Sequence, residues 1–385
     1  MRYRLPPLPL RAFVLLFGLA LFLAPASASA QGPGQTQTQT RRAIQYPSTT
    51  PDIVLYTMGN GNVIFEKWGH AALCIEYPRS PRYSRCYNYG TTDFRNPSKV
   101  VWEFLRGGGT FWVSVTTPDR MIRRYMAFDR TLWRQVLPLS PEQAQRAADM
   151  LRTDALPENR YYTYNHFFNN CSTRVRDIID QASDGLLSRD AEQPVGPTFR
   201  DYARRGFAEM TWALVGTDYM LGRQADVQPN LWELMFLPRY MREQVTLRFG
   251  VEPNKIFQRR GHEFSQDPGL GGRHLVVLLA LLLAGLIALS RWAGSPRQQT
   301  LAVTVAVVPS FLISLIMWGL ASISSLEALR YNEILLVYLP FDIVLPFLRS
   351  DRRQHYARIR IIGLILVSLL AAIGVFNQPL WIPIL

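Results

Sequence analysis

The cysteines of this chain divide into a pair and a single thiol. Cys74 and Cys86 fall on two segments that are expected to pair as a hairpin, and we predict a disulfide between them. Cys171 is then left unpaired. It follows Asn170 at the expected start of a helix, where free backbone N–H groups and the helix dipole favour thiolate. The sequence therefore offers Cys171 as a candidate nucleophile, against the alternative of a buried, inert cysteine.

A nucleophilic cysteine needs a histidine that is oriented by a third polar group. His70 is the favoured partner because it lies on a predicted strand, and strand alternation makes Asn88 its diagonal neighbour on the same face. Asn88 is our first choice for the third member, and Asp93 is the second. Neither C-x-x-C nor H-E-x-x-H spacing occurs in the chain, so we expect no metal and no cofactor. The other histidines have less suitable surroundings: His166, His262, His274 and His355.

Strands and helices must position these side chains. Residues 53–58, 70–77, 84–90 and 110–116 have the β-branched and aromatic content of strands. From Pro118 the pattern becomes helical. One helix is expected after Ser140 and Pro141, an N-cap followed by a proline at the first helical position. A second should begin at NNCSTRVRDIIDQA, where apolar residues recur at helical spacing.

The chain has 385 residues, and hydrophobic stretches cluster at its two ends. Residues 1–30 are typical of a secretory signal peptide, with a basic start, an apolar centre and Ala28-Ser29-Ala30 as the cleavage pattern. Residues 31–41 form a polar linker, 42–273 an extracytoplasmic globular domain, and 274–385 a transmembrane domain with about four helices. The apolar stretches of that last domain are 275–290, 301–322, 334–348 and 361–377; the third is short and contains two prolines and Asp342.

Charge favours a membrane topology over a nucleic-acid function. The net charge is +13, but no Lys/Arg run with interleaved aromatics marks a nucleic-acid surface. The loop 349–360 holds five arginines, and the loop 291–299 holds two, whereas the intervening 323–333 is balanced. Because positive loops face the cytoplasm, residues 42–273 and the C-terminus are expected outside it.

Four segments together resemble the periplasmic domain of the Lnb-type lipoprotein N-acyltransferases. They are EKWGHAALCIEY (66–77), YNYGTTDF (87–94), PENRYYTYNHFFNNCSTRVRD (157–177) and LGRQADVQPNLWELMFLP (221–238). The resemblance implies an α+β chain: a permuted papain-like extracytoplasmic domain followed by an α-helical transmembrane bundle. It further implies a multi-pass protein of the bacterial inner membrane with its catalytic domain in the periplasm.

The activity implied by the resemblance is acyl transfer. A fatty acyl chain would move from a membrane phospholipid to the α-amino group of a diacylglyceryl lipoprotein, through a thioester on Cys171 with His70 as general base. The Cys171 backbone N–H is the expected oxyanion donor, with the Asn170 side chain as a second. Two other classes remain open: a membrane-anchored cysteine peptidase or amidase acting on the cell wall, and a non-catalytic membrane-anchored binding module.

Overall fold

The computed structural model describes residues 46–47, 49–93 and 95–381. The predicted signal peptide and linker lie outside these residues. The described chain is a mixed α/β protein in which an antiparallel sheet precedes three long apolar helices. This agrees with the expected α+β class.

The sheet has seven strands in the order β6-β4-β3-β2-β1-β5-β7, and every neighbouring pair is antiparallel. The four strands predicted from the sequence correspond to β1, β2, β3 and β4, the first four along the chain. Three further strands were not predicted. The strands are β1 (Asp52–Met58), β2 (His70–Glu76), β3 (Arg85–Thr91), β4 (Thr110–Thr116), β5 (Leu132–Val136), β6 (Tyr161–Thr163) and β7 (Asn254–Phe257).

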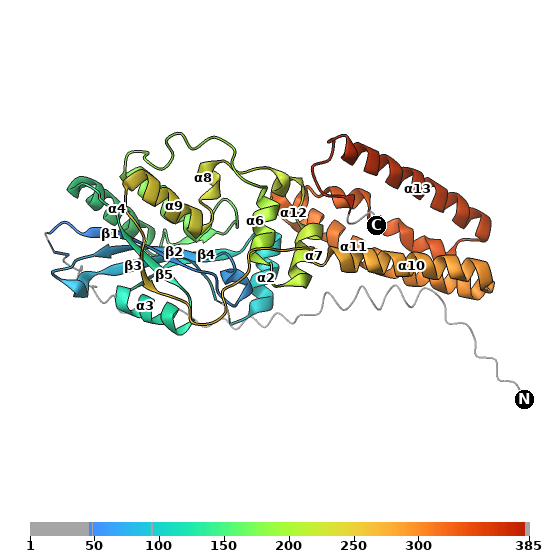
Figure 1. Cartoon of the computed structure of the whole chain (residues 1–385), viewed down its shortest axis with the longest axis horizontal. Helices are drawn as coiled ribbons and strands as arrows, with labels where there is room; N and C mark the ends of the chain where they lie inside the picture. Colours follow the sequence, from blue (N-terminus) through green and yellow to red (C-terminus); the bar gives the residue numbers. More distant parts are fainter. Residues whose placement is uncertain (1–45, 48, 94, 382–385) are drawn as a thin grey trace, which may run out of the picture. The chain divides into compact units, whose positions relative to one another are not determined.

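Helices cover both faces of the sheet (Figure 1). Leu55 and Leu73 belong to the face that packs on α4 (Pro141–Asp154), α5 (Cys171–Ala182) and α9 (Pro238–Phe249). The alternate residues, among them Val54 and Ala72, face α3 (Pro118–Ala127). Since strand side chains alternate, neighbouring residues of one strand reach opposite layers of the core. The shorter helices are α2 (Pro97–Arg106), α6 (Phe199–Gly206), α7 (Thr211–Met220) and α8 (Leu231–Leu234), with 3-10 turns η1 (Ile64–Glu66), η2 (Pro81–Tyr83) and η3 (Arg223–Asp226).

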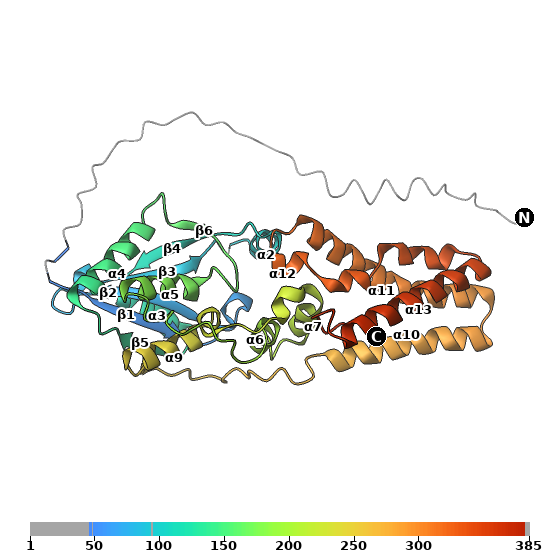
Figure 2. The same cartoon turned by 90° about the horizontal axis from the view of Figure 1, so that it is seen from above.

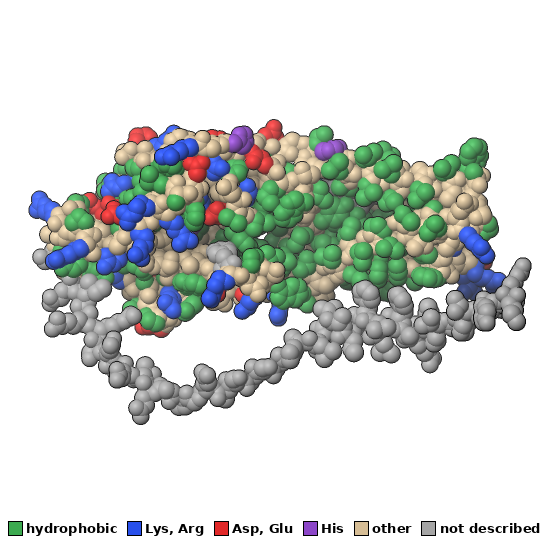
Figure 3. Space-filling model, turned by 90° about the horizontal axis from the view of Figure 1, so that it is seen from below, with side chains coloured by type: hydrophobic (Ala, Val, Ile, Leu, Met, Phe, Trp, Pro, Cys, Tyr) green, Lys and Arg blue, Asp and Glu red, His purple; other side chains and the backbone are tan. Residues whose placement is uncertain are grey.

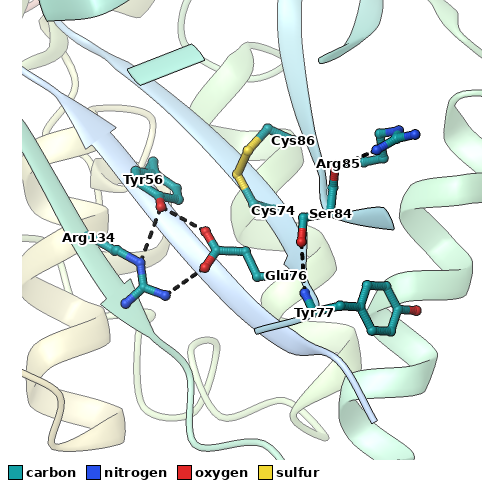
Figure 4. The surroundings of a disulfide bond; sticks show 8 residues. All are labelled: Tyr56, Cys74, Glu76, Tyr77, Ser84, Arg85, Cys86 and Arg134. Atoms are coloured by element: carbon teal, nitrogen blue, oxygen red, sulfur yellow. Dashed lines mark hydrogen bonds and ion pairs between the residues drawn. A yellow bond between two sulfur atoms is a disulfide. The ribbon is translucent and has the colours of Figure 1, made fainter. Parts of the chain in front are cut away.

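A disulfide fastens the β2–β3 hairpin (Figure 4). Cys74 and Cys86 are register partners and are bonded to each other. On the same face of the sheet Glu76 accepts hydrogen bonds from Tyr56 (2.7 Å) and Arg134 (2.6 Å). The hairpin is thus held covalently at its turn end, and the pairing of β2 with β3 stops at Leu73.

Three helices are long and apolar enough to cross a membrane: α10 (Arg273–Ala293), α11 (Pro296–Ile323) and α13 (Ser350–Ala372). Helices α10 and α11 lie side by side in Figures 1 and 2. Apolar side chains cover the surface around them, whereas charged side chains gather on the sheet-containing part (Figure 3). The described chain therefore has the features of a membrane protein.

The third apolar stretch, which its shortness and two prolines had marked as a broken span, contains no long α-helix. It forms η4 (Glu333–Leu336) and η5 (Pro340–Phe347), after the short α12 (Glu327–Arg330). Each proline lacks the N–H that a helix interior needs, so an α-helix is not sustained here. Within this segment Asp342 binds Arg360 of α13 at 2.8 Å.

The irregular segment nevertheless passes from one end of the spans to the other. At one end Gln378, beyond α13, donates to the Glu333 carboxylate (3.0 Å). At the other, Arg353 donates to Thr300, close to the start of α11 (3.4 Å). Backbone that is not α-helical is tolerated at membrane depth where protein covers it. This path returns the chain to the α11 start before α13 begins, as the charge pattern of the loops requires.

We expect the disulfide to contribute measurably to stability. Replacing both cysteines (Cys74→Ala with Cys86→Ala) should lower the free energy of unfolding by about 3 kcal/mol, because the bond restricts the unfolded chain. Thermal unfolding in detergent, with and without reductant, measures the effect. Reductant should lower the midpoint of the wild-type protein and leave the double variant unchanged; an unaltered wild-type midpoint would contradict the prediction.

Candidate active site

Cys171 is the first residue of α5, and its position is fixed by the cap before it. The Asn170 side-chain oxygen accepts from the N–H groups of Ser172 (2.8 Å) and Thr173 (2.9 Å). In return, the Thr173 hydroxyl accepts from the Asn170 N–H (2.8 Å). This capping box explains why the helix begins at Cys171. The apolar stripe that includes Val175 then holds α5 on the sheet.

Asn170 is committed to this structural role. Its side-chain nitrogen donates to the carbonyl oxygens of His166 (2.7 Å) and Phe236 (2.9 Å). Both amide hydrogens are used in these two bonds. The expected second oxyanion donor is therefore occupied, and the structure corrects that part of the sequence interpretation.

The Cys171 thiol meets the first residues of β2. The backbone N–H groups of Ala71 and Ser172, and its own N–H, lie near the sulfur and act to lower the thiol pKa. Ala71 can donate in this direction because β2 no longer pairs with β3 at this point. His70 is the residue directly before Ala71. The structure thus brings the predicted nucleophile and the predicted base to the same end of the sheet.

Gly69 allows His70 to begin its strand here. It has φ 87°, and a Cβ at this position would lie 2.6 Å from the Met58 carbonyl oxygen. A side chain would therefore collide with the neighbouring strand β1, so glycine is required. Gly69 therefore has a specific function in the backbone, because it allows β2 to begin at His70.

His70 lies near the Asn88 amide, the Tyr125 ring and the positive charge of Arg130. Asn88 makes a side-chain hydrogen bond to the imidazole, and the Tyr125 ring stacks on it with centroids 5.8 Å apart. Within the described residues, Nε2 of His70 is buried and has no hydrogen-bond partner. The hydrogen bond that the other ring nitrogen donates to Asn88 therefore orients the ring and leaves Nε2 available for a proton. Asp93, the second choice for the third member, is instead exposed and pairs with Arg95.

Burial keeps both reacting groups neutral at rest. It raises the pKa of the Cys171 thiol, although the three backbone N–H groups and the charge of Arg130 act to lower it. It also lowers the pKa of His70 to about 3, although the hydrogen bond that the ring donates to Asn88 acts to raise it. The expected lowering of the thiol pKa by the helix start is therefore outweighed by desolvation. Both groups are therefore more stable in their neutral forms.

Arg130 and Tyr125 are members of the site that the sequence did not indicate. Arg130 is 2% exposed; it donates to the Gly59 carbonyl (2.8 Å), pairs with Glu66 (3.3 Å) and lies over the Tyr125 ring. Its positive charge lowers the pKa of both Cys171 and His70. Arg130 precedes β5, which was not predicted, so no local pattern pointed to it.

Gly90 lies directly beside the Cys171 side chain. A Cβ at Gly90 would lie 3.6 Å from the Cβ of Cys171 and 3.8 Å from the Tyr164 ring, and its φ of 83° also disfavours a side chain.

His166 has a different role. Its ring packs edge-on against Trp68 (4.3 Å) and Phe236 (5.8 Å), as its aromatic surroundings had suggested.

Residues 38–205 match the family model of the Lnb N-terminal periplasmic domain. The matched range contains β1 to β4, β6 and α5, and hence both His70 and Cys171. No curated protein and no solved structure matches the chain. This part of the chain is therefore similar to the periplasmic domain of the Lnb family. Together with the three apolar helices, it describes a membrane protein with a periplasmic domain.

Removing the charge of Arg130 should make Cys171 less reactive. In Arg130→Met the thiol pKa rises, so less thiolate is present at neutral pH and alkylation of Cys171 should slow by about three- to tenfold. The rate of iodoacetamide labelling against pH measures this. Arg124→Met is the matched control, because Arg124 acts on His70 and Tyr125 and is more exposed. An equal slowing in both variants would exclude a specific role for Arg130.

Buried neutral histidines should also make the fold sensitive to acid. The folded-state pKa is lowered to about 3 for His70 and about 4 for His166, whereas both are near 6.5 when exposed. The unfolded chain therefore binds more protons below pH 6.5. Each histidine should reduce the free energy of unfolding by about 1.4 kcal/mol per pH unit as pH falls from 6.5 toward its folded value.

His166→Phe tests this sign, because it removes one of the two contributions and retains an aromatic ring. Denaturant unfolding at several pH values between 6.5 and 4 should show a shallower slope for the variant. Equal slopes would show that His166 titrates normally in the folded protein.

Proposed function

We propose that this protein is a thiol acyltransferase that moves a fatty acyl chain from a membrane phospholipid to the α-amino group of diacylglyceryl lipoproteins. The observation that carries the proposal is the contact between the Cys171 sulfur and the N–H beside His70. A thiol at a helix start, next to a strand that delivers a histidine, is the arrangement of papain-like enzymes. Here the histidine strand precedes the cysteine helix, which supports the permuted form of that fold.

The first half-reaction transfers the acyl group to the enzyme. The Cys171 sulfur attacks the carbonyl carbon of a phospholipid ester while Nε2 of His70 accepts the thiol proton. The tetrahedral intermediate collapses, and the lysophospholipid alkoxide leaves with the proton from His70. A thioester remains on Cys171. Because both groups start neutral, the imidazolium forms only as the sulfur attacks.

The second half-reaction transfers the acyl group to the lipoprotein. The free amine attacks the thioester carbon, and His70 accepts a proton from the amine nitrogen. The C–S bond breaks, and the leaving thiolate recovers that proton. The products are an amide and the original thiol. A site that excludes water favours the amine over hydrolysis, and the burial of Cys171 supports this step.

The oxyanion of each intermediate needs donors close to the sulfur. The backbone N–H groups of Cys171 and Ala71 are suited to this, since both already point at the Cys171 sulfur. They replace the Asn170 amide, which is bound to two carbonyl oxygens. Fixed backbone donors stabilise developing charge without reorganisation.

The apolar helices favour an enzyme with lipid substrates over a cell-wall peptidase or a binding module. A cell-wall peptidase could use the same cysteine and histidine, but its substrate is water-soluble and gives the apolar helices no part in catalysis. A binding module would not require the thiol. We therefore place the enzyme in the bacterial inner membrane, where phospholipids and lipoproteins are both present.

Purified protein in vesicles that contain acyl-labelled phosphatidylethanolamine tests the reaction. The label should become attached to the wild-type protein in a hydroxylamine-sensitive bond, and Cys171→Ala should abolish it. His70→Ala should slow acylation by about 10²- to 10⁴-fold, because the general base is lost. His262→Ala is the control, since His262 is exposed and pairs with Glu209. A label retained in Cys171→Ala would refute the proposed nucleophile.

The acceptor needs a separate test. Mass analysis of lipoprotein N-termini should show N-acylated forms in cells that express the wild-type protein and none in cells that express Cys171→Ala. If Cys171 is acylated from lipid but the lipoprotein N-termini are identical in the two strains, the donor half-reaction stands and the acceptor is wrong.

A further inference from the structure

Helix α2 presents apolar side chains on two of its sides. Val100 is buried (5% exposed) and Phe104 is partly buried, and these residues attach the helix to the domain. Val101 and Trp102 lie on another side and are 40% and 50% exposed. A charged side chain, Lys99, is also exposed on this helix. An exposed apolar side flanked by charge is typical of a helix at a membrane surface.

The end of α2 is bonded to the end of a membrane span. The Leu105 carbonyl accepts from the Ser324 hydroxyl (2.6 Å), and the Arg106 carbonyl accepts from the Ser325 N–H (3.0 Å). These serines directly follow Ile323, where α11 ends. Helix α2 therefore lies level with the end of the apolar helix α11. Figure 2 shows α2 beside α12 and the end of α11.

A second exposed tryptophan lies at the corresponding end of α10. Trp212 of α7 is 67% exposed. Its neighbour Thr211 contacts the residue before α10, since a Cβ at Gly272 would lie 2.8 Å from the Thr211 side chain. The start of α10 and the end of α11 lie on the same side of the membrane, because one hairpin joins the other two ends. Tryptophans are enriched at this depth of a membrane.

Aromatic rings connect α2 with the thiol. Phe104 of α2 packs on Tyr164 with ring centroids 6.2 Å apart, and Phe111 packs on the same tyrosine at 4.4 Å. Tyr164 also lies beside Gly90, which adjoins Cys171. A continuous series of aromatic contacts therefore connects α2 with the surroundings of the sulfur.

We propose that α2 rests in the extracytoplasmic leaflet, with Val101 and Trp102 in contact with phospholipid, and that acyl chains reach Cys171 past Phe104 and Tyr164. The first half of this proposal is independent of the enzymatic activity. The second half rests on the proposed acyltransferase function. The partner of this surface is the phospholipid leaflet itself, because the surface is continuous with the ends of α10 and α11.

Photocrosslinking tests the lipid contact without reference to activity. A p-benzoylphenylalanine at position 102, in full-length protein in vesicles of phosphatidylethanolamine and phosphatidylglycerol, should form lipid adducts that mass spectrometry detects. The same residue at position 247 is the control, because Leu247 of α9 is 73% exposed and lies on a helix that packs on the sheet. An adduct yield at 102 no higher than at 247 would overturn the membrane contact.

Acylation from two donors tests the route. The double variant V101E/W102E should acylate Cys171 from vesicle phospholipid about tenfold more slowly, because charged side chains resist contact with hydrocarbon. Its acylation by water-soluble dibutyrylphosphatidylcholine should be unchanged. Leu247→Glu, the matched control, should alter neither rate.

The outcomes separate the two proposals. If V101E/W102E is slowed equally with both donors, α2 has no role in lipid access. If wild-type protein is acylated by neither donor while the crosslink at 102 forms, the proposed acyltransferase function fails and the lipid contact stands. Trp102→Gln, a milder change at an exposed position, should give a smaller slowing with vesicles alone and serves if the double variant does not fold.

Discussion

The site depends on one contact, in which the N–H of Ala71 meets the sulfur of Cys171. It forms because pairing between β2 and β3 ends at Leu73, which leaves the start of β2 open to the first turn of α5. A buried N–H must find an acceptor, and the sulfur is the acceptor in this position. If the hairpin continued for two more residues, this N–H would bond to β3, and the thiol would lose its neighbour on the histidine strand. The end of a strand pairing therefore defines where the chemistry occurs.

Desolvation sets the electrostatic character of this site. Both reacting groups are buried, so each is more stable in its neutral form. Arg130 offsets the burial of the thiol, yet the same charge works against an imidazolium at His70. A permanent ion pair between Cys171 and His70 is thus disfavoured. Glu66 partly neutralises the charge of Arg130 through their ion pair. The electrostatic effect on Cys171 and His70 therefore depends on the η1 turn, which carries Glu66, as well as on Arg130.

Local sequence patterns predicted the elements that carry the reacting groups. The strand with His70, the hairpin with Cys74 and Cys86, and the helix start at Cys171 were all visible as short signals. Strands β5 to β7 and the role of Arg130 were not, because they depend on contacts between residues far apart in the chain, such as Arg130 with Gly59. The thiol pKa was misjudged for a related reason: a helix start is a local feature, whereas burial depends on the whole fold. Whether the third membrane stretch forms a helix or a broken span was ambiguous, because a hydropathy value counts apolar residues and takes no account of the two prolines that prevent an α-helix.

The proposed contact of α2 with the membrane requires that the periplasmic domain is fixed firmly to the membrane helices. A buried ion-pair cluster provides such a hold: Asp218 of α7 binds Arg204 of α6 and Arg273, the first residue of α10. Asn332 adds a bond from the membrane part to the Tyr219 carbonyl (2.8 Å). Separating α10 from the domain would take Arg273 away from the buried Asp218 carboxylate and leave it with Arg204 alone, which costs free energy. The two parts therefore move together, and the depth of the spans in the bilayer fixes the distance between the lipid surface and the thiol.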